Sequence, residues 1–272
     1  MKFLVTGGRG FIGSHFVETV LDLGHTVIDI DKMTYAANKQ LPWDNNERYT
    51  LIQEDIADLK HLPNCDVLVN FAAESHVDNS IRDTEPFIKS NILGVHNLLE
   101  LVRGKPEYNR PLFFHISTDE VYGDRLEGSF TEEDKLKPSN PYSASKASAE
   151  MLVLSYNRTY GLKYISPITN IRTITMNWNH LVLFYATNAF WQKLFFILPW
   201  AIIVCASCYY VRDWTYVKDN VDGILKIIQS RVVNEIYNIA SENHMRNLEV
   251  VDEVLSWFGK DREMIQFVPP RS

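Results

Sequence analysis

Near its N-terminus the chain has the sequence Thr6-Gly7-Gly8-Arg9-Gly10-Phe11-Ile12-Gly13. A short apolar run at 3–5 comes before these glycines, and residues 13–23 after them have the apolar spacing of a helix. The next apolar segment, 26–30, predicts a second strand. Strand, glycine turn, helix and strand in this order predict a βαβ unit, and therefore a parallel sheet.

The same alternation continues along the chain. Apolar runs predict strands at 49–52, 67–71, 112–116 and 235–239, and apolar spacing predicts helices at 86–102, 145–160, 221–228 and 248–258. Strands separated by helices favour an α/β fold, a doubly wound parallel sheet with helices on both faces. We expect residues 1–165 to form this domain and residues 166–272 to form a mixed segment.

The glycine turn suits a dinucleotide. Gly7, Gly10 and Gly13 let the backbone turn sharply, approach a pyrophosphate closely and point N–H groups at it from the start of a helix. A plain turn also uses glycines, but Asp31, at the end of the second strand, can accept hydrogen bonds from ribose hydroxyls. Because a carboxylate there repels a ribose phosphate, the sequence favours NAD over NADP, with Lys32 as the one opposing feature.

Tyr142 and Lys146 lie four residues apart at the start of a predicted helix, so both side chains point the same way. A free tyrosine has a pKa of about 10 and is a poor base at neutral pH, but a nearby ammonium and a cationic nicotinamide lower that pKa. A Tyr–Lys pair of this spacing is otherwise common on protein surfaces. After a nucleotide-binding turn, it favours a general base.

A polar segment, Ser117-Thr118-Asp119-Glu120-Val121-Tyr122-Gly123, directly follows the strand at 112–116. It lies at the carboxyl edge of the predicted sheet, where ligands bind in open α/β folds. Its two adjacent carboxylates are either solvated loop charges or an acid–base pair, and their place in this fold favours the pair.

Composition narrows the class of protein. Of 272 residues, 46% are hydrophobic and 22% charged, which is typical of globular proteins. With 27 basic and 34 acidic residues, a net charge of −7 and no Lys/Arg-rich run, we expect no nucleic-acid partner. Three cysteines are too few for a disulfide framework, and glycines interrupt the N-terminal apolar run too early for a signal peptide. These features predict a cytoplasmic protein.

The glycine turn, the Tyr142/Lys146 pair and the segment 117–123 together resemble the extended short-chain dehydrogenase/reductase family that acts on nucleotide sugars, whose fold is Rossmann-like. Three further segments are similar to its dTDP-glucose 4,6-dehydratase branch: Asp31-Lys32-Met33-Thr34-Tyr35, Ala72-Ala73-Glu74-Ser75-His76-Val77-Asp78 and Arg212-Asp213-Trp214-Thr215-Tyr216-Val217-Lys218-Asp219. The Asp119–Glu120 pair discriminates best, because related epimerases and decarboxylases lack it.

The resemblance implies dehydration of a nucleoside-diphosphate hexose, dTDP-glucose above all, to its 4-keto-6-deoxy derivative. NAD would take a hydride from carbon 4 while Tyr142, held by Lys146 and Thr118, removes the hydroxyl proton. Glu120 would take the hydrogen on carbon 5, Asp119 would protonate the departing 6-hydroxyl, and the hydride would return to carbon 6. Two carboxyls in opposite protonation states suit such paired steps.

The resemblance also implies which residues bind. The catalytic residues would be Thr118, Asp119, Glu120, Tyr142 and Lys146. The NAD-binding residues would be Gly7, Gly10, Phe11, Ile12, Gly13, Asp31, Lys32, Thr34, Asp55, Ile56, Ala72, Ala73, Ser75, Ser90, Tyr142 and Lys146. The substrate-binding residues would be Ser75, His76, Thr118, Arg212 and Asn247; a structural role is the alternative for His76, and a helix N-cap for Asn247. No metal is expected.

Residues 166–210 depart from the family pattern. The chain has no Asp or Glu from 151 to 212 and no Gly from 162 to 222, and residues 194–211 carry no charge. Three explanations stay open: a compensated reading-frame shift, an apolar lid or partner surface, and, least favoured, a membrane segment. The family also continues past residue 268 with further helices, so we expect a shortened C-terminus and a partial substrate-binding region.

Three functions therefore compete. The first is the dehydratase, the second another nucleotide-sugar epimerase or decarboxylase, and the third a degenerate NAD-binding homologue without activity. Family analogy further implies a homodimer formed through the helices at 91–102 and 145–160.

Overall fold

The computed structural model describes residues 1–125, 128–169, 174–177, 180–183, 202–205, 211–257 and 259–268. The chain divides into two compact units. The first consists of Met1–Thr169 and Val217–Ile239, and the second of Asn170–Tyr216 and Ala240–Ser272.

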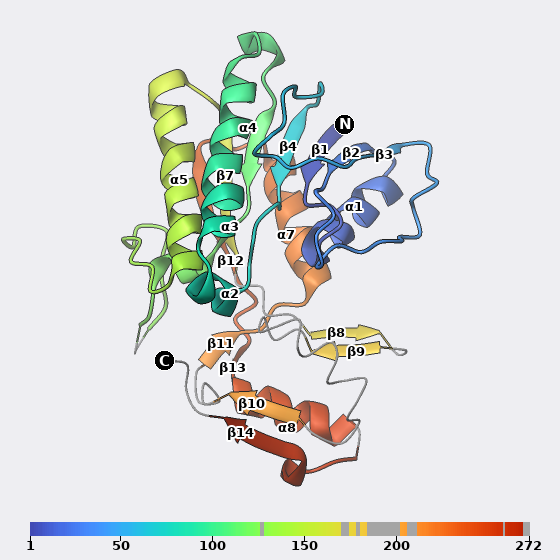
Figure 1. Ribbon diagram of the computed structural model, residues 1–272, viewed down its shortest axis with the longest axis vertical. Coiled ribbons are helices and arrows are strands. Elements are labelled where there is room, and N and C mark those ends of the chain that lie inside the picture. Colours follow the sequence, from blue (N-terminus) through green and yellow to red (C-terminus); the bar gives the residue numbers. More distant parts are fainter. Residues whose placement is uncertain are drawn as a thin grey trace. The chain divides into compact units, whose positions relative to one another are not determined.

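The first unit is built on an eight-stranded sheet (Figure 1). Its strands are β1 (Lys2–Thr6), β2 (Thr26–Ile30), β3 (Tyr49–Ile52), β4 (Val67–Asn70), β5 (Leu112–His115), β6 (Ser117–Thr118), β7 (Tyr164–Thr169) and β12 (Glu235–Ile239). They run in the order β12-β7-β5-β4-β1-β2-β3, with β6 also beside β7, and the pairings within this sheet are parallel. Because the order reverses between β1 and β4, this is the predicted doubly wound fold, which is confirmed.

Helices cover both faces of this sheet, which gives it two apolar cores. The helical segments are α1 (Phe11–Asp22), α2 (Val77–Arg82), α3 (Glu85–Phe87), η1 (Ile88–Leu93), α4 (Gly94–Arg103), η2 (Glu107–Asn109), η3 (Asp119–Tyr122), α5 (Pro141–Tyr160) and α7 (Val217–Ser230). Phe3 and Val5 pack in the core that holds α1 and α7, while Leu4 between them packs in the core that holds α4 and α5. Successive residues of a strand point to opposite faces, so a sheet covered on both sides needs continuous apolar strands.

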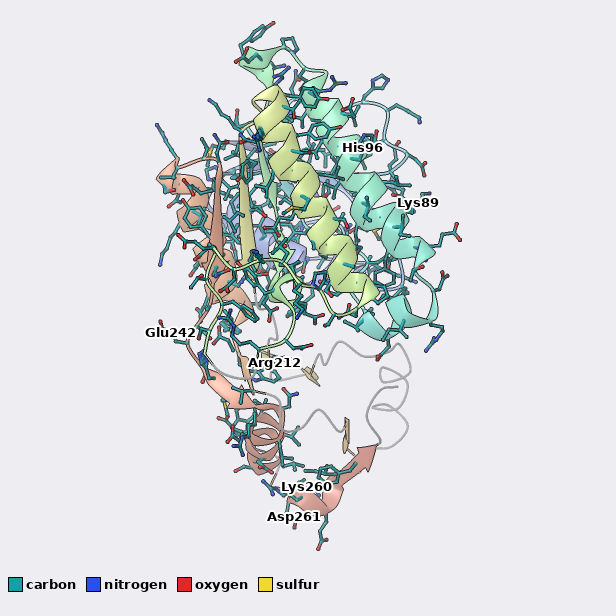
Figure 2. The ribbon with its side chains drawn as sticks, turned by 90° about the vertical axis from the view of Figure 1, so that its left-hand side faces the viewer. Lys89, His96, Arg212, Glu242, Lys260 and Asp261 are labelled. Atoms are coloured by element: carbon teal, nitrogen blue, oxygen red, sulfur yellow. The ribbon has the colours of Figure 1, made fainter. Side chains whose placement is uncertain are left out.

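The long helix predicted at 86–102 is divided into three parts. After α3 the backbone forms one stretch of π-helix, η1, and then continues as α4. A π-helical turn inserts an extra residue and is often found at functional sites. Figure 2 shows this segment lying beside α5, with Lys89 and His96 labelled on it.

Helix α5 begins at Pro141, earlier than the predicted residue 145. The Asn140 side chain caps it by accepting a hydrogen bond from the Ser143 amide, and the Ser143 hydroxyl accepts one from the Asn140 amide. Proline at the first helical position already has the required φ angle. The helix ends at Gly161, whose φ of 66° is the left-handed conformation that glycine adopts easily.

The boundary expected at 165 lies inside β7, and the chain later returns to the first unit. Strand β12 pairs with β7, with Glu235 opposite Ile165, and α7 buries Val221 and Ile224 in the core shared with α1. Residues after 217 thus cover the outer edge of β7 and share with α1 the covering of one face of the sheet.

The described residues of the second unit form three strand pairs. They are β8 (Ile174–Asn177) with β9 (His180–Leu183), β10 (Ile202–Cys205) with β14 (Ile265–Val268), and β11 (Val211–Asp213) with β13 (His244–Arg246). Helix α8 (Asn247–Trp257) and η5 (Arg262–Met264) are the helical segments described in this unit. Most of the aberrant stretch 166–210 lies outside the described residues. Within the described part of the chain, no helix has the length and apolar character needed to cross a membrane.

Candidate active site

The glycine turn leaves no room for side chains. Gly7 has a φ of +73°, and a Cβ there would lie 2.7 Å from the Ala72 amide nitrogen. A Cβ on Gly13 would collide with the carbonyl oxygen of Gly7. The turn and the start of α1 therefore pack backbone against backbone beside the end of β4. No residue in the described first turn of α1 is acidic, so the positive end of that helix is left for an anion.

The Asp31 carboxylate, just after β2, is held by two hydrogen bonds from backbone amides. Its Oδ2 accepts a hydrogen bond from the Arg9 amide at 3.1 Å, and its Oδ1 accepts one from the Met33 amide at 2.8 Å. Each carboxylate oxygen has a second lone pair, so the same group can still accept from ribose hydroxyls.

A second aspartate, Asp29, lies buried under the turn and was not singled out from the sequence. Its Oδ1 accepts from the Gly8 amide at 2.9 Å, and its Oδ2 accepts from the Tyr49 hydroxyl at 2.8 Å. Burial raises the pKa of Asp29 to about 7, although the hydrogen bond from Tyr49 lowers it. The signal in the sequence was a carboxylate on an inward-facing position of an otherwise apolar strand.

Replacing Asp29 with asparagine is expected to flatten the pH dependence of stability. The folded protein holds the Asp29 proton up to a pKa of about 7, whereas the unfolded chain releases it at about 4. The wild-type free energy of unfolding should therefore fall as pH rises across this window, and Asp29→Asn should reduce that loss by about 2 kcal/mol. Urea unfolding at pH 5 and pH 8 measures it, with Asp22→Asn, an exposed site, as the control. Equal pH slopes for wild type and Asp29→Asn would contradict the shift.

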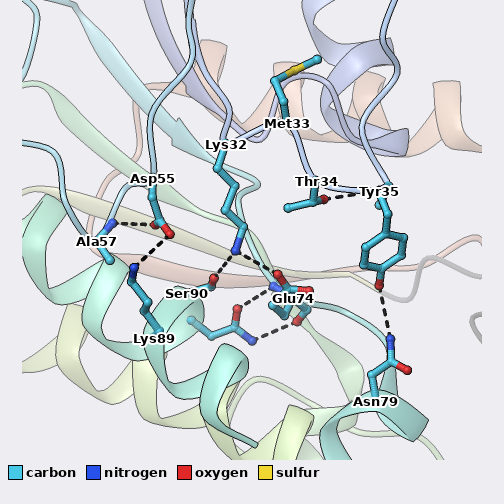
Figure 3. A network of polar contacts seen from close by, with 12 residues as sticks. Lys32, Met33, Thr34, Tyr35, Asp55, Ala57, Glu74, Asn79, Lys89 and Ser90 are labelled. Carbon is cyan, nitrogen blue, oxygen red and sulfur yellow. Dashed lines mark hydrogen bonds and ion pairs between the residues drawn. The ribbon is translucent and has the colours of Figure 1, made fainter. Parts of the chain in front are cut away.

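Lys32 joins three segments of the predicted cofactor site (Figure 3). Its Nζ donates to the Glu74 carboxylate at 2.9 Å and to the Ser90 hydroxyl at 2.7 Å. Lys32 follows β2, Glu74 follows β4, and Ser90 lies on η1, so the contact brings the predicted Lys32 and Ser90 together. Glu74 itself was quoted in the sequence motif but not assigned a role.

Asn91, on the π-helix η1, connects this cluster to the predicted catalytic helix. Its Oδ1 accepts from the Glu74 amide at 2.8 Å, and its Nδ2 donates to the Glu74 carbonyl and to the Ser145 hydroxyl at 3.0 and 2.8 Å. The residue is buried. Sequence reasoning missed it; the signal was an asparagine on the buried face of a helix otherwise lined with apolar residues.

Helix α5 carries Tyr142 and Lys146 near its capped end. The Tyr142 amide donates to the Ser80 hydroxyl at 3.1 Å, and the ring meets Phe87 edge to face. Lys146 is buried, and its Nζ donates to the Ile116 carbonyl at 2.6 Å. Burial lowers the pKa of Lys146 to about 8, while the charge of Glu150 raises it.

The predicted acid–base segment lies against the same helix. Thr118 accepts a hydrogen bond from the Glu120 amide and donates to Asp119, and Asn140, the cap of α5, donates to Glu120 Oε2 at 3.2 Å. The structure thus brings the elements that carry Thr118, Asp119 and Glu120 together with the one that carries Tyr142 and Lys146. After η3 the chain turns at Gly123, where φ is +83° and a Cβ would collide with the Lys137 carbonyl.

The remaining predicted residues fall into two groups. In the first unit, Ile56 is buried, Asp55 lies 3.6 Å from the Lys89 ammonium, and Ala72, Ala73 and Ser75 follow β4. The His76 ring stacks on Tyr35, which follows Thr34, and burial lowers the pKa of His76. Arg212 on β11 and Asn247, the first residue of α8, belong to the second unit and are described there alone.

The first unit fits NAD. Its turn excludes side chains from the pyrophosphate position, Asp31 offers acceptors to a ribose, and Lys32 and Ser90 lie together at the carboxyl edge of the sheet. Phe11 and Ile12 open α1, so their backbone faces the same position. Among the described residues, no group of three His, Cys, Asp or Glu side chains is arranged to hold a metal ion.

Comparison with known proteins agrees with this geometry. The family model described as GDP-mannose 4,6 dehydratase matches residues 4–267. The chain belongs to the GDP-mannose 4,6 dehydratase family. The expected resemblance to nucleotide-sugar dehydratases is thereby confirmed.

Two sequence relatives of this GDP-mannose 4,6 dehydratase family member match most of the chain. The low-salt glycan biosynthesis protein Agl12 of Haloferax volcanii is 36% identical over 285 residues, which cover 100% of this chain and 87% of the relative. The dTDP-glucose 4,6-dehydratase of Haemophilus influenzae is 39% identical over 276 residues, covering 93% of this chain and 78% of the relative.

A solved structure gives the same comparison in three dimensions. DesIV, the dTDP-glucose 4,6-dehydratase of Streptomyces venezuelae crystallised with NAD and TYD bound, superposes with a TM-score of 0.87 at 32% identity. The match covers 100% of this chain and 85% of DesIV.

Proposed function

We propose that this chain is an NAD-dependent lyase that dehydrates a nucleoside-diphosphate hexose, dTDP-glucose, to its 4-keto-6-deoxy derivative. The observation that carries the proposal is the adjacent Asp119–Glu120 pair, held by Thr118 and Asn140 at the start of the helix that bears Tyr142 and Lys146. An epimerase needs a base for one hydroxyl but no pair of carboxyls for an elimination. The relatives named dTDP-glucose 4,6-dehydratase support the substrate.

Tyr142, Glu120 and Asp119 each have a separate task in the proposed reaction. Tyr142, held by Lys146 and Thr118 and with its phenolate favoured by the Lys146 charge, removes the proton of the 4-hydroxyl. Glu120 takes the hydrogen on carbon 5, which the new 4-keto group makes acidic, and Asp119 gives its proton to the departing 6-hydroxyl. Bound NAD supplies the hydride acceptor for carbon 4 and the hydride donor for carbon 6.

The binding residues are part of the same proposal. The glycine turn would hold NAD together with Asp31, Lys32, Thr34, Asp55, Ile56, Ala72, Ala73, Ser75 and Ser90. Ser75 and His76 face the sugar, Arg212 pairs with a substrate phosphate and Asn247 contacts the nucleotide.

Incubation of the purified full chain with dTDP-glucose tests the proposal. The 4-keto product absorbs at alkaline pH, so its appearance supports a dehydratase. A changed sugar without a keto product would instead indicate an epimerase. Bound NAD without any turnover would indicate a degenerate homologue.

A homodimer in the cytoplasm completes the proposal. Large apolar side chains on two neighbouring helical segments are about half exposed: Ile88 and Leu93 on η1 and Met151 on α5. These segments lie toward the viewer in Figure 2. A second copy of the chain packing there would remove this apolar surface from water.

Placing charges on this surface is expected to give a monomer. The double variant Leu93→Glu with Met151→Glu would bury four carboxylates in a two-fold interface, which outweighs the apolar contacts. Analytical ultracentrifugation should show the mass of a dimer for the wild type and half that mass for the variant. Tyr108→Glu, on η2 and 92% exposed, is the control that should remain a dimer. A double variant that still sediments as a dimer would place the interface elsewhere.

A further inference from the structure

Glu150 is a buried carboxylate that the proposed reaction does not use. It lies one helical turn after Lys146 on α5 and is 0% exposed. Its Oε2 accepts a hydrogen bond from the Ser117 hydroxyl at 2.8 Å, while its Oε1 has no hydrogen-bond partner among the described residues. A carboxylate in such a place is costly unless a positive charge compensates it.

The compensating charge is Lys146. Residues four apart on a helix lie on the same face, so the ammonium and the carboxylate share one side of α5. Lys146 is itself 4% exposed, and its ammonium donates a hydrogen bond to the Ile116 carbonyl. Each of the two groups is therefore a buried charge that the other neutralises.

Three other titratable groups near the pair, His115, Tyr122 and Tyr164, are neutral. His115 on β5 is fully buried, and burial lowers its pKa well below the usual range, with the Lys146 charge acting in the same direction. Tyr122 on η3 and Tyr164 on β7 feel the Glu150 charge, and burial raises the pKa of both. Among these neighbours, Glu150 is therefore the group whose charge opposes that of Lys146.

We propose that Glu150 is a positioning residue that keeps Lys146 charged beside Tyr142 and, through Ser117, holds the Thr118 strand against α5. This rests on the proposed function, in which the Lys146 charge favours the Tyr142 phenolate. Without a carboxylate at 150, the buried ammonium loses its counter-charge and releases its proton more easily. The phenolate then loses the neighbouring ammonium at neutral pH. Ser117 directly precedes Thr118, so the same carboxylate also sets where the Thr118 hydroxyl lies.

The variant Glu150→Gln tests the charge, because glutamine keeps the volume and can still accept from Ser117. The readout is the ionisation of Tyr142, measured as tyrosinate absorbance in each protein minus that of its Tyr142→Phe counterpart. We expect the midpoint in Glu150→Gln to rise by about one pH unit and turnover at pH 7 to fall about tenfold, with NAD still bound. Glu150→Asp, which retains the charge, should keep its midpoint close to that of the wild type.

Ser117→Ala is a second and smaller change that does not depend on Glu150→Gln folding. It removes the hydrogen bond that favours the charged carboxylate, so the Tyr142 midpoint should shift in the same direction by less. If Glu150→Gln folds and its Tyr142 midpoint is unchanged, Glu150 has only a packing role. If Glu150→Gln does not fold, an unchanged midpoint in Ser117→Ala leads to the same conclusion. A wild type with neither a Tyr142-dependent titration nor turnover would instead overturn the proposed function.

Discussion

Replacing Tyr142 with phenylalanine is expected to lower kcat for the 4-keto product by about 10²- to 10⁴-fold, the usual range for loss of a general base. The ring would remain against Phe87, and the backbone amide would keep its bond to Ser80, so the fold of α5 should not change. NAD should remain bound, because the glycine turn and the Lys32 cluster do not involve the phenol. Steady-state assay with dTDP-glucose, together with the ratio of NAD to protein, measures both effects.

Tyr160→Phe is the matched control for this variant. It makes the same chemical change at the other end of the same helix, where the side chain is 43% exposed and lies under the Arg103 guanidinium. Activity should stay at the wild-type level. A Tyr142→Phe enzyme that kept at least a third of the wild-type kcat would remove this tyrosine from the reaction.

Replacing Glu120 with glutamine is expected to separate the two halves of the reaction. Oxidation at carbon 4 depends on Tyr142 and should continue, whereas removal of the hydrogen on carbon 5 loses its base. Product formation should fall by about 10²- to 10³-fold while the absorbance of reduced nicotinamide accumulates in a single turnover. Rapid mixing of the holoenzyme with substrate records both signals.

Glutamine at 120 can still accept the hydrogen bond that Asn140 gives to Glu120, so the start of α5 should stay in place. The control is Glu133→Gln, at an exposed position between η3 and α5, which should leave both signals unchanged. If product formation fell and reduced nicotinamide did not accumulate, Glu120 would act before the elimination or only support the structure.

The sheet could be predicted from the sequence because its signals are local. Apolar runs of four or five residues bounded by glycine, proline or polar residues placed 26–30, 49–52 and 235–239 where the structure has strands. Helix α5 begins earlier than predicted. Its start is fixed by side-chain hydrogen bonds between Asn140 and Ser143, and apolar periodicity does not reveal such a cap. The π-helix η1 could not be predicted either, since an inserted residue leaves the apolar pattern on both sides intact.

The candidate site could be predicted from the sequence only where its residues lie close together along the chain. The spacing of Tyr142 and Lys146 and the adjacency of Asp119 and Glu120 are of that kind. The contacts that hold them are not: Lys32 meets Glu74 across 42 residues, Asn91 meets Ser145 across 54, and Ser117 meets Glu150 across 33. Which polar side chains meet depends on the sheet order, and no local pattern carries that information.

The return of the chain to the first unit has a consequence for its synthesis. On the ribosome, β7 is complete long before β12 and α7 emerge, so an exposed strand edge and an uncovered apolar face persist while the intervening segment is translated. A truncated product ending before residue 217 would keep both liabilities. Such fragments should therefore aggregate or be captured by chaperones, and premature stop codons in this interval should yield insoluble protein rather than a free nucleotide-binding half.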